Sequence, residues 1–92
     1  MNIFIGIGTI TDVNYDGRAL KFKLNLLQNK PCVVPCLLID PSEQFKAYME
    51  ELLTSEEAVW LQGKISFSEY DYKGQPRRSF QILTYEKGIK AI

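Results

Sequence analysis

A cluster of aromatic and basic side chains lies near the C-terminal end of the sequence, on both sides of a short turn. Its members are Tyr70, Tyr72, Lys73, Arg77 and Arg78. Proteins that bind single-stranded nucleic acid combine aromatic rings, on which bases stack, with cations that follow the phosphates. Because the cluster supplies both kinds of group, it predicts a surface that holds a single-stranded polymer.

Three lysines outside the cluster could extend this cationic surface across the rest of the domain: Lys21, Lys23 and Lys64. Lysines on strands also have a simpler role, because a charged side chain keeps an exposed strand edge from pairing with another chain. The residue pattern does not choose between the two roles. We therefore keep the three lysines as candidate contacts beside the cluster.

No residue pattern indicates catalysis. The chain has no histidine, and no nucleophile stands beside a base in a recognisable motif. The segment Gly6-Ile7-Gly8 lacks the third glycine and the following helix of a dinucleotide-binding fingerprint. We therefore predict that the protein is not an enzyme and that it has no cofactor.

The two cysteines, Cys32 and Cys36, are four positions apart. In a strand they would be separated by ~13 Å, at ~3.3 Å per residue. A disulfide needs Cα atoms within ~7 Å of each other, so the two cannot bridge. A zinc site would need further cysteine or histidine ligands. We expect both cysteines to be small apolar residues of the core, with no bound metal.

The length and composition indicate one globular domain over residues 1–92. Eleven basic and eleven acidic residues give a net charge of zero. This balance argues against a highly electrostatic nucleic-acid binder, although it allows a local basic patch. No apolar run approaches the ~20 residues of a membrane span, and the N-terminus lacks a positively charged leader. We expect a cytoplasmic protein with no membrane partner.

Apolar and polar residues alternate with a period of two in several segments, which indicates strands. The clearest is the segment 19–26, where Leu20 and Phe22 share one face. An apolar stripe with helical spacing follows Asp40 and Ser42, either of which can cap the helix. The expected elements are strands at 2–13, 19–26 and 32–39, a helix after 42, and strands at 59–72 and 77–85.

Five strands with a helix between the third and fourth predict an all-β barrel with one helix, the five-stranded OB-fold. A small α+β sandwich and an SH3-like barrel are the alternatives on pattern alone. Gly6 and Gly8 predict a bulge or a tight bend in the first strand, and Pro35 predicts an edge or a bulge in the third.

The fourth strand should present two different faces. Its expected inward residues are Val59, Leu61, Ile65 and Phe67. Trp60 should point outward, where a tryptophan is costly to leave in water, so it should contact another subunit or stack on a ligand. Of these two partners we prefer the subunit.

Several segments resemble the bacterial single-stranded DNA-binding protein family, in order and over essentially the whole chain. The start, Asn2-Ile3-Phe4-Ile5-Gly6-Ile7-Gly8, is similar to the family's opening, in which Asn-x precedes three apolar residues and Gly. Leu20-Lys21-Phe22-Lys23-Leu24 resembles its Ala-Asn-Phe-Ser-Leu strand, and Val34-Pro35-Cys36 its Ile-Pro-Val. Val59-Trp60-Leu61-Gln62-Gly63-Lys64-Ile65 resembles its Val-x-Val-Glu-Gly-Arg-Leu, and Gly74-Gln75-Pro76-Arg77 its Gly-Gln-x-Arg hairpin.

The resemblance implies an OB-fold that binds single-stranded DNA in replication, recombination or repair, with RNA as a second polymer to consider. It implies a nucleoid-associated protein of the cytoplasm, with a plastid as the alternative location. The family pairs its barrels through first-strand edges into dimers and often tetramers. The resemblance therefore implies a homo-oligomer interface, for which the candidate residues are Asn2, Phe4, Gly6 and Trp60.

Two departures from the family imply weaker binding. Val33 and Ile39 occupy places where the family usually presents aromatic residues, a loss of ~2–6 kcal/mol if each stack is worth ~1–3. The loop between the second and third strands is also short, which is similar to the small primosomal OB protein of bacteria and to reduced forms in cyanobacteria and plastids. The alternative function is therefore a protein-interaction or scaffold module that has lost most nucleic-acid binding.

Overall fold

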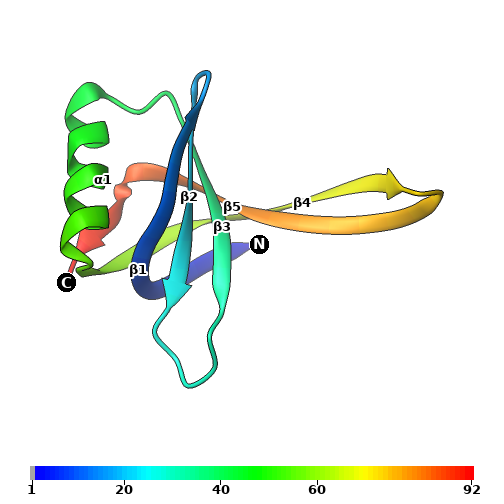
Figure 1. Ribbon diagram of the computed structural model, residues 1–92, viewed down its shortest axis with the longest axis horizontal. Helices are drawn as coiled ribbons and strands as arrows, with labels where there is room; N and C mark the ends of the chain where they lie inside the picture. The colour runs from blue at the N-terminus through cyan, green and yellow to red at the C-terminus, as the bar shows by residue number, and fades with distance from the viewer. Residues whose placement is uncertain (1) are drawn as a thin grey trace.

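The computed structural model describes residues 2–92 and shows a closed five-stranded barrel with one helix beside it (Figure 1). The elements are β1 (Ile3–Asp16), β2 (Ala19–Leu26), β3 (Val33–Ile39), α1 (Glu43–Ser55), β4 (Ala58–Tyr72) and β5 (Gln75–Ala91). Around the barrel the strands follow the order β1-β2-β3-β5-β4. The helix lies between the third and fourth strands in sequence, as expected, and the closed sheet excludes a sandwich.

The first strand is long enough to pair with two neighbours. Its first half pairs with β4 and its second half with β2. The register with β2 shifts between Thr11 and Asn14, where Asp12 has a φ of 53°. Of the bulge or tight bend predicted at Gly6 and Gly8, the bulge therefore lies further along the strand. At Gly8 a backbone oxygen leaves no room for a Cβ, whereas at Gly6 the nearest atoms belong to the side chains of Phe4 and Leu26.

A short parallel seam between β3 and β5 completes the barrel. It consists of the pairs Cys36–Ile82 and Leu37–Leu83. Pro35, which has no N–H to donate, stands just before this seam. The register between β3 and β2 is regular past this residue. Of the two alternatives predicted at Pro35, the bulge is therefore not present, and the residue lies on a part of β3 that pairs with β2 alone.

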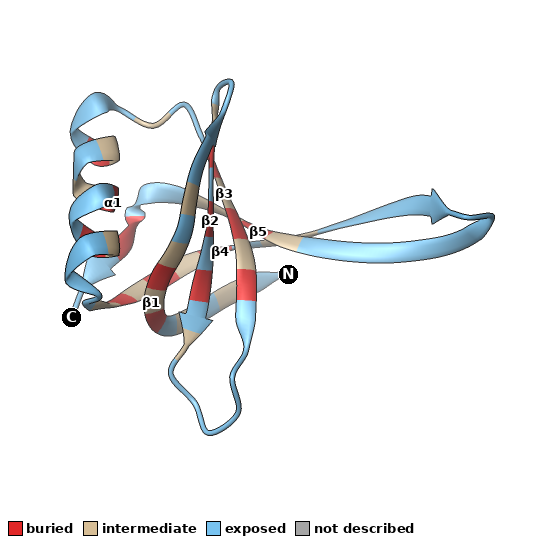
Figure 2. Cartoon of the chain, in the orientation of Figure 1, coloured by how far each residue is buried: buried red, intermediate tan, exposed pale blue. Residues whose placement is uncertain are grey.

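The barrel interior and one face of α1 share a single apolar core. The helix buries Phe45, Met49 and Leu52, and it covers one side of the barrel (Figure 1). Figure 2 shows the buried residues where α1 faces the barrel and along the barrel strands. The strands contribute Ile10, Leu20, Phe22, Leu24, Val34, Cys36, Leu38, Val59, Leu61, Ile82 and Ile89 to this core.

The two cysteines have different environments. Cys36 is buried, as predicted, and its burial raises the pKa of the thiol to about 12. Cys32 is exposed, so the prediction of a core position for it is wrong. The reason is that β3 begins at Val33, which leaves Cys32 in the loop before the strand. Neither cysteine forms a disulfide.

Of the two candidate helix caps, Ser42 takes the role. Its hydroxyl accepts the backbone N–H of Phe45 at 3.1 Å and donates to a carboxylate oxygen of Glu86 at 2.7 Å. The helix is 13 residues long, and the C-cap residue Glu56 has a φ of 56°. None of the helices in residues 2–92 has the length and apolar character needed to cross a membrane.

The last strand is longer than expected, because the chain rejoins β4 after Tyr85. One stretch of β5 pairs with β4 as far as Thr84, and a second stretch pairs from Ile89 onward. At the break the Thr84 hydroxyl donates to the carbonyl of Gln62 at 2.8 Å. A Cβ on Gly88 would stand 2.6 Å from the same oxygen, so this position has room only for glycine.

Candidate nucleic-acid interface

The β4–β5 hairpin extends far beyond the barrel (Figure 1), and its distal half is exposed (Figure 2). Pairing of β1 with β4 reaches Lys64, and pairing of β3 with β5 begins at Ile82. Beyond these residues the two strands pair with each other. The turn has φ values of 52° at Lys73 and 75° at Gly74, positive as a two-residue type I′ turn requires. Gln75 already belongs to β5, so the turn is tighter than expected.

One face of the hairpin, which we call the tyrosine face, brings most of the predicted cluster together. It consists of Ser68, Tyr70, Tyr72, Gln75, Arg77 and Ser79. Tyr70 and Arg77 are direct cross-strand partners, and both tyrosine rings are about half exposed. At the turn, the Lys73 ammonium lies 5.4 Å from the centre of the Tyr72 ring. This face therefore offers two rings and two cations within one short stretch of surface.

The opposite side, which we call the phenylalanine face, follows from the alternation of side chains along each strand. It consists of Phe67, Glu69, Asp71, Pro76, Arg78 and Phe80. The Phe67 and Phe80 rings have centroids 6.5 Å apart and are tilted by 50°. Arg78 lies over Phe67, 5.9 Å from the ring centre, and its Nε is 3.4 Å from a carboxylate oxygen of Glu69. Arg78 is thus separated from Tyr70, Tyr72 and Arg77, with which the sequence had grouped it.

The prediction that Phe67 points into the core is wrong, since 58% of its surface is exposed. Ile65 still packs against the core. Phe67, the next residue on the same face of β4, lies beyond the end of the barrel and therefore has no core to pack against. The pairing of Phe67 with Phe80 was missed because it joins residues of two different strands. The tight turn at Lys73 and Gly74 fixes the register that brings these rings together, and it was the signal available in the sequence.

Two of the three candidate lysines outside the cluster are already paired with acids. Lys21 lies 3.0 Å from a carboxylate oxygen of Asp16, and Lys23 lies 3.3 Å from one of Asp12. Both lysines line a shallow groove of about 590 Å³ on the barrel surface. Lys64 is exposed on β4 opposite Ile3. The barrel surface therefore offers weaker attraction for phosphates than the three lysines alone suggest.

The third strand presents aliphatic side chains where stacking rings would be useful. Val33 and Ile39 point outward and are 51% and 54% exposed. They pair with Asn25 and Ala19 of β2. These places are thus available to a ligand, but they offer no aromatic surface.

The candidate oligomer residues do not share one surface. Phe4 points inward and packs against the core, and the tip of its ring would lie 2.7 Å from a Cβ on Gly6. Asn2 is exposed, and Trp60 is partly buried, with the Lys90 ammonium 5.9 Å from its ring centre. The outward side of this part of β1 is instead an exposed apolar row, formed by Ile3, Ile5 and Ile7.

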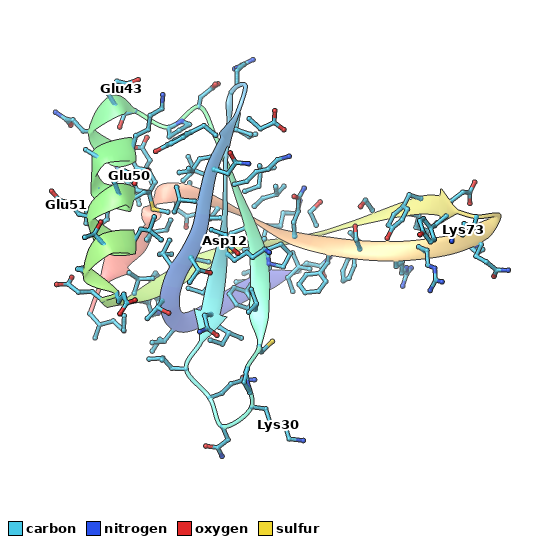
Figure 3. All side chains as sticks on the ribbon, in the orientation of Figure 1. Asp12, Lys30, Glu43, Glu50, Glu51 and Lys73 are labelled. Carbon is cyan, nitrogen blue, oxygen red and sulfur yellow. The ribbon has the colours of Figure 1, made fainter. Side chains whose placement is uncertain are left out.

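Opposite charges are separated along the molecule, which the net charge of zero conceals. Residues 43–57 hold five acidic side chains and one basic one. Figure 3 shows Glu43, Glu50 and Glu51 on α1, with Lys73 at the distant tip of the hairpin. Among residues 2–92 no group of three histidine, cysteine, aspartate or glutamate side chains is placed to hold a metal ion. Residues 69–78 around the hairpin turn hold three basic and two acidic side chains, so this end of the molecule carries a small net positive charge.

No protein-family model matches the sequence, and no curated protein matches it significantly. Solved structures do match, over nearly the full length. The Plasmodium falciparum SSB in complex with ssDNA aligns with a TM-score of 0.65 at 16% identity, over 100% of this chain and 93% of that chain. The mitochondrial single-stranded DNA-binding protein Rim1 of S. cerevisiae aligns at 12% identity with a TM-score of 0.78, over 99% and 94%. A second Rim1 structure gives a TM-score of 0.69.

These likenesses confirm the predicted fold. The chain has the five-stranded OB-fold architecture of the single-stranded DNA-binding proteins that it matches. The neighbours come from a protozoan parasite and from yeast mitochondria. The cyanobacterial or plastid type therefore stays a prediction.

Proposed function

We propose that this protein is a single-stranded DNA-binding domain, without enzymatic activity, and that the tyrosine face is its main contact surface. The observation that carries the proposal is the grouping of Tyr70, Tyr72, Lys73 and Arg77 on a hairpin that projects from the barrel. Bases can stack on the two rings while the cations contact phosphates. The structural likeness to two single-stranded DNA-binding proteins supports this function. A role in replication, recombination or repair at the nucleoid follows from the same activity.

We expect this binding to be weaker than that of a related protein with aromatic residues on its third strand. Val33 and Ile39 are exposed but aliphatic, and each missing stack costs ~1–3 kcal/mol. Lys21 and Lys23 are each held by an aspartate, so a phosphate must compete with that carboxylate. Most of the affinity should therefore come from the hairpin.

Fluorescence anisotropy with labelled oligo-dT, first at low and then at rising salt, tests the proposed function. We expect saturable binding that weakens as salt is added, because phosphate contacts release counterions. Duplex DNA of the same length is the control and should bind more weakly, since its bases are not free to stack. Oligo-U in the same titration measures the preference for DNA over RNA. No oligo-dT binding at high micromolar protein would remove the proposal.

A protein-interaction or scaffold module is the second candidate function. The observation that favours it is the exposed aliphatic pair Val33 and Ile39 beside lysines that acids already neutralise. A partner protein bound there should protect the amides of β3 from hydrogen exchange. Tight oligo-dT binding that is lost in Tyr70→Ala would count against this candidate.

We also propose that the protein forms a dimer or tetramer through the first half of β1. Before Gly8 this strand has β4 on one side, whereas pairing with β2 starts at Gly8 on the other. The row of Ile3, Ile5 and Ile7 lies on the same surface as Trp60, which pairs with Ile7. Contiguous apolar surface of this kind is typical of subunit contacts.

Light scattering tests the oligomer over a range of protein concentrations. We expect a mass above the 10.6 kDa of one chain. Ile5→Asp should lower that mass, because it places a charge in the apolar row. Ile92→Asp is the matched control, since Ile92 is exposed but lies outside the row. A constant mass of one chain for the unmodified protein would contradict the oligomer.

A further inference from the structure

We propose that the phenylalanine face of the hairpin is a second stacking site for bases, while the phosphates of the same strand stay on the tyrosine face and at the tip. This inference rests on the proposed function and deepens it, because it assigns a role to Phe67 and Phe80. The two sides of one narrow hairpin would then hold different parts of a single nucleic acid.

The two phenylalanine rings form an exposed platform. Phe67 is 58% and Phe80 45% exposed, although apolar rings of this size are normally buried. Their centroids are 6.5 Å apart with a tilt of 50°, so they pack on each other and leave their outer surfaces free. Pairs of exposed rings on a strand ladder are the kind of surface on which successive bases stack.

The charges on this face favour bases over phosphates. Glu69 and Asp71 lie on the same side as the rings, and the one cation there, Arg78, is 3.4 Å from Glu69. A phosphate would meet net negative charge, whereas a base carries no charge and only needs a ring to stack on. Arg77 lies on the opposite face, and Lys73 stands at the turn between the two faces. The phosphates therefore have a separate place to bind.

The dimensions of the hairpin allow one strand to use both faces. Two paired β-strands lie only ~4.8 Å apart, so a flexible single strand can cross the edge of the hairpin within a few nucleotides. Beyond the barrel the two strands pair with each other, and both faces are exposed there.

A second copy of this chain, or another protein, is the competing occupant of the phenylalanine face. Such a partner would have to bury Glu69, Asp71 and Arg78 together with the rings, and removing charges from water is costly. Bases can cover the rings and leave these charged groups hydrated. The observations therefore favour nucleic acid, and the experiment below keeps the protein partner as an outcome.

The test uses a double variant that carries both Phe67→Thr and Phe80→Thr. Its affinity for oligo-dT is compared with that of the unmodified protein. Threonine keeps the preference for strand structure while it removes the rings. Oligo-dT should bind the double variant about 10-fold more weakly or worse, since each stack of ~1–3 kcal/mol exceeds or approaches one tenfold step. The dependence on salt should not change, because no phosphate contact is lost. Tyr85→Thr is the matched control, because Tyr85 is an exposed aromatic residue of β5 beyond the stretch that pairs with β4 in the projecting hairpin.

An abasic oligonucleotide of the same length supplies the second readout. It keeps the phosphates but has no bases, so the double variant and the unmodified protein should bind it equally. If the double variant unfolds, the single variants Phe67→Thr and Phe80→Thr carry the same comparison, each with a smaller loss of oligo-dT affinity.

Three results would overturn the inference while leaving the proposed function in place. The first is equal affinity for oligo-dT with and without the two rings. The second is an equal loss of affinity for the abasic oligonucleotide, which would mean that the face contacts the backbone. The third is a lower mass of the double variant in light scattering, with unchanged affinity for oligo-dT, which would identify a second copy as the occupant. No oligo-dT binding by the unmodified protein would instead remove both the function and the inference.

Discussion

Tyr70 and Arg77 lie directly opposite each other across the hairpin, whereas the next residue, Arg78, points to the other side and contacts Glu69. Two adjacent arginines of the same exposed segment thus have different surroundings. Arg77 stands beside two tyrosine rings, and Arg78 stands beside an acid and a phenylalanine. Substitutions of these two arginines therefore probe opposite faces of the hairpin, although the two residues are adjacent in the sequence.

Arg77→Ala should weaken oligo-dT binding and should make the negative slope of log affinity against log salt shallower by about 0.7, the value for one lost phosphate contact on a single strand. Arg78→Ala should leave the slope nearly unchanged, since its guanidinium is already paired with Glu69. Anisotropy titrations at several salt concentrations measure both slopes. A greater change in slope for Arg78→Ala than for Arg77→Ala would show that the phosphates follow the other face.

Tyr70→Ala should lower oligo-dT affinity by about 10-fold, in keeping with the ~1–3 kcal/mol of one base stack. Tyr70→Phe should keep most of the affinity, because it retains the ring and loses only the hydroxyl. The same titration measures both variants at one salt concentration. Equal losses for the alanine and phenylalanine variants would argue that the hydroxyl makes the contact and that the ring does not.

Gly8→Ala should destabilise the fold strongly. A Cβ at this position would stand 2.2 Å from the carbonyl oxygen of Asn25, a backbone atom that cannot move without disturbing the pairing of β1 and β2. Overpacking of this kind costs ~1–3 kcal/mol, and a backbone clash belongs at the upper end. Gly6→Ala is the milder control, since its nearest contact is the ring tip of Phe4. Urea unfolding curves should rank the two variants in this order.

The ion pair between Arg18 and Asp40 should make stability depend on pH in the acid range. The guanidinium Nε donates to a carboxylate oxygen at 2.7 Å, and this hydrogen bond lowers the pKa of Asp40. Because the unfolded carboxyl takes up its proton at a higher pH, the contribution is complete above about pH 4 and is lost as pH falls through the lower, folded-state pKa.

Asp40→Asn removes this contribution, and asparagine tolerates the φ of 52° at this position. Melting curves followed by circular dichroism should show a lower Tm for the variant at about pH 7 and a smaller difference at about pH 3. The effect should be small, because both side chains are exposed. A difference that grows as the pH falls would contradict the assigned role of Asp40.

The two thiols should differ sharply in reactivity. A disulfide-exchange reagent at neutral pH should modify Cys32 and spare Cys36, because Cys36 is buried and its pKa is raised to about 12. In denaturant both thiols should react. Counting the released chromophore under the two conditions gives the result directly. Modification of both thiols in the native protein would mean that β3 opens readily.

Several parts of this fold could be predicted because they depend on neighbours in the sequence. The strict alternation in 19–26 predicted the bounds of β2, and Asp40 and Ser42 indicated where the helix begins, although only the structure selects Ser42 as the cap. Phe67 was misplaced because alternation assigns a face to a residue, whereas it does not say where the barrel ends. The return of β5 past Gly88 depends on contacts with β4, and no local pattern reports them.

The candidate site was predictable in part for the same reason. Tyr70, Tyr72, Lys73 and Arg77 are close in sequence, so their types alone indicated a shared surface. Assigning Arg78 to the other face needed the parity of both strands, counted from the tight turn. The ion pairs of Lys21 and Lys23 join β2 to Asp16 and Asp12 of β1, and Asp12 lies in the bulge that shifts the register.

The final stretch of β5 also determines where the molecule can be attached to a surface. Its end lies beside α1, on the side of the barrel away from the hairpin (Figure 1), and the N–H of Ala91 donates to the hydroxyl of Tyr48 at 3.2 Å. A tether at Ile92 would therefore leave the whole hairpin free in solution. A sensor chip or an optical trap linked through this end would present the two faces of the hairpin equally to a passing strand.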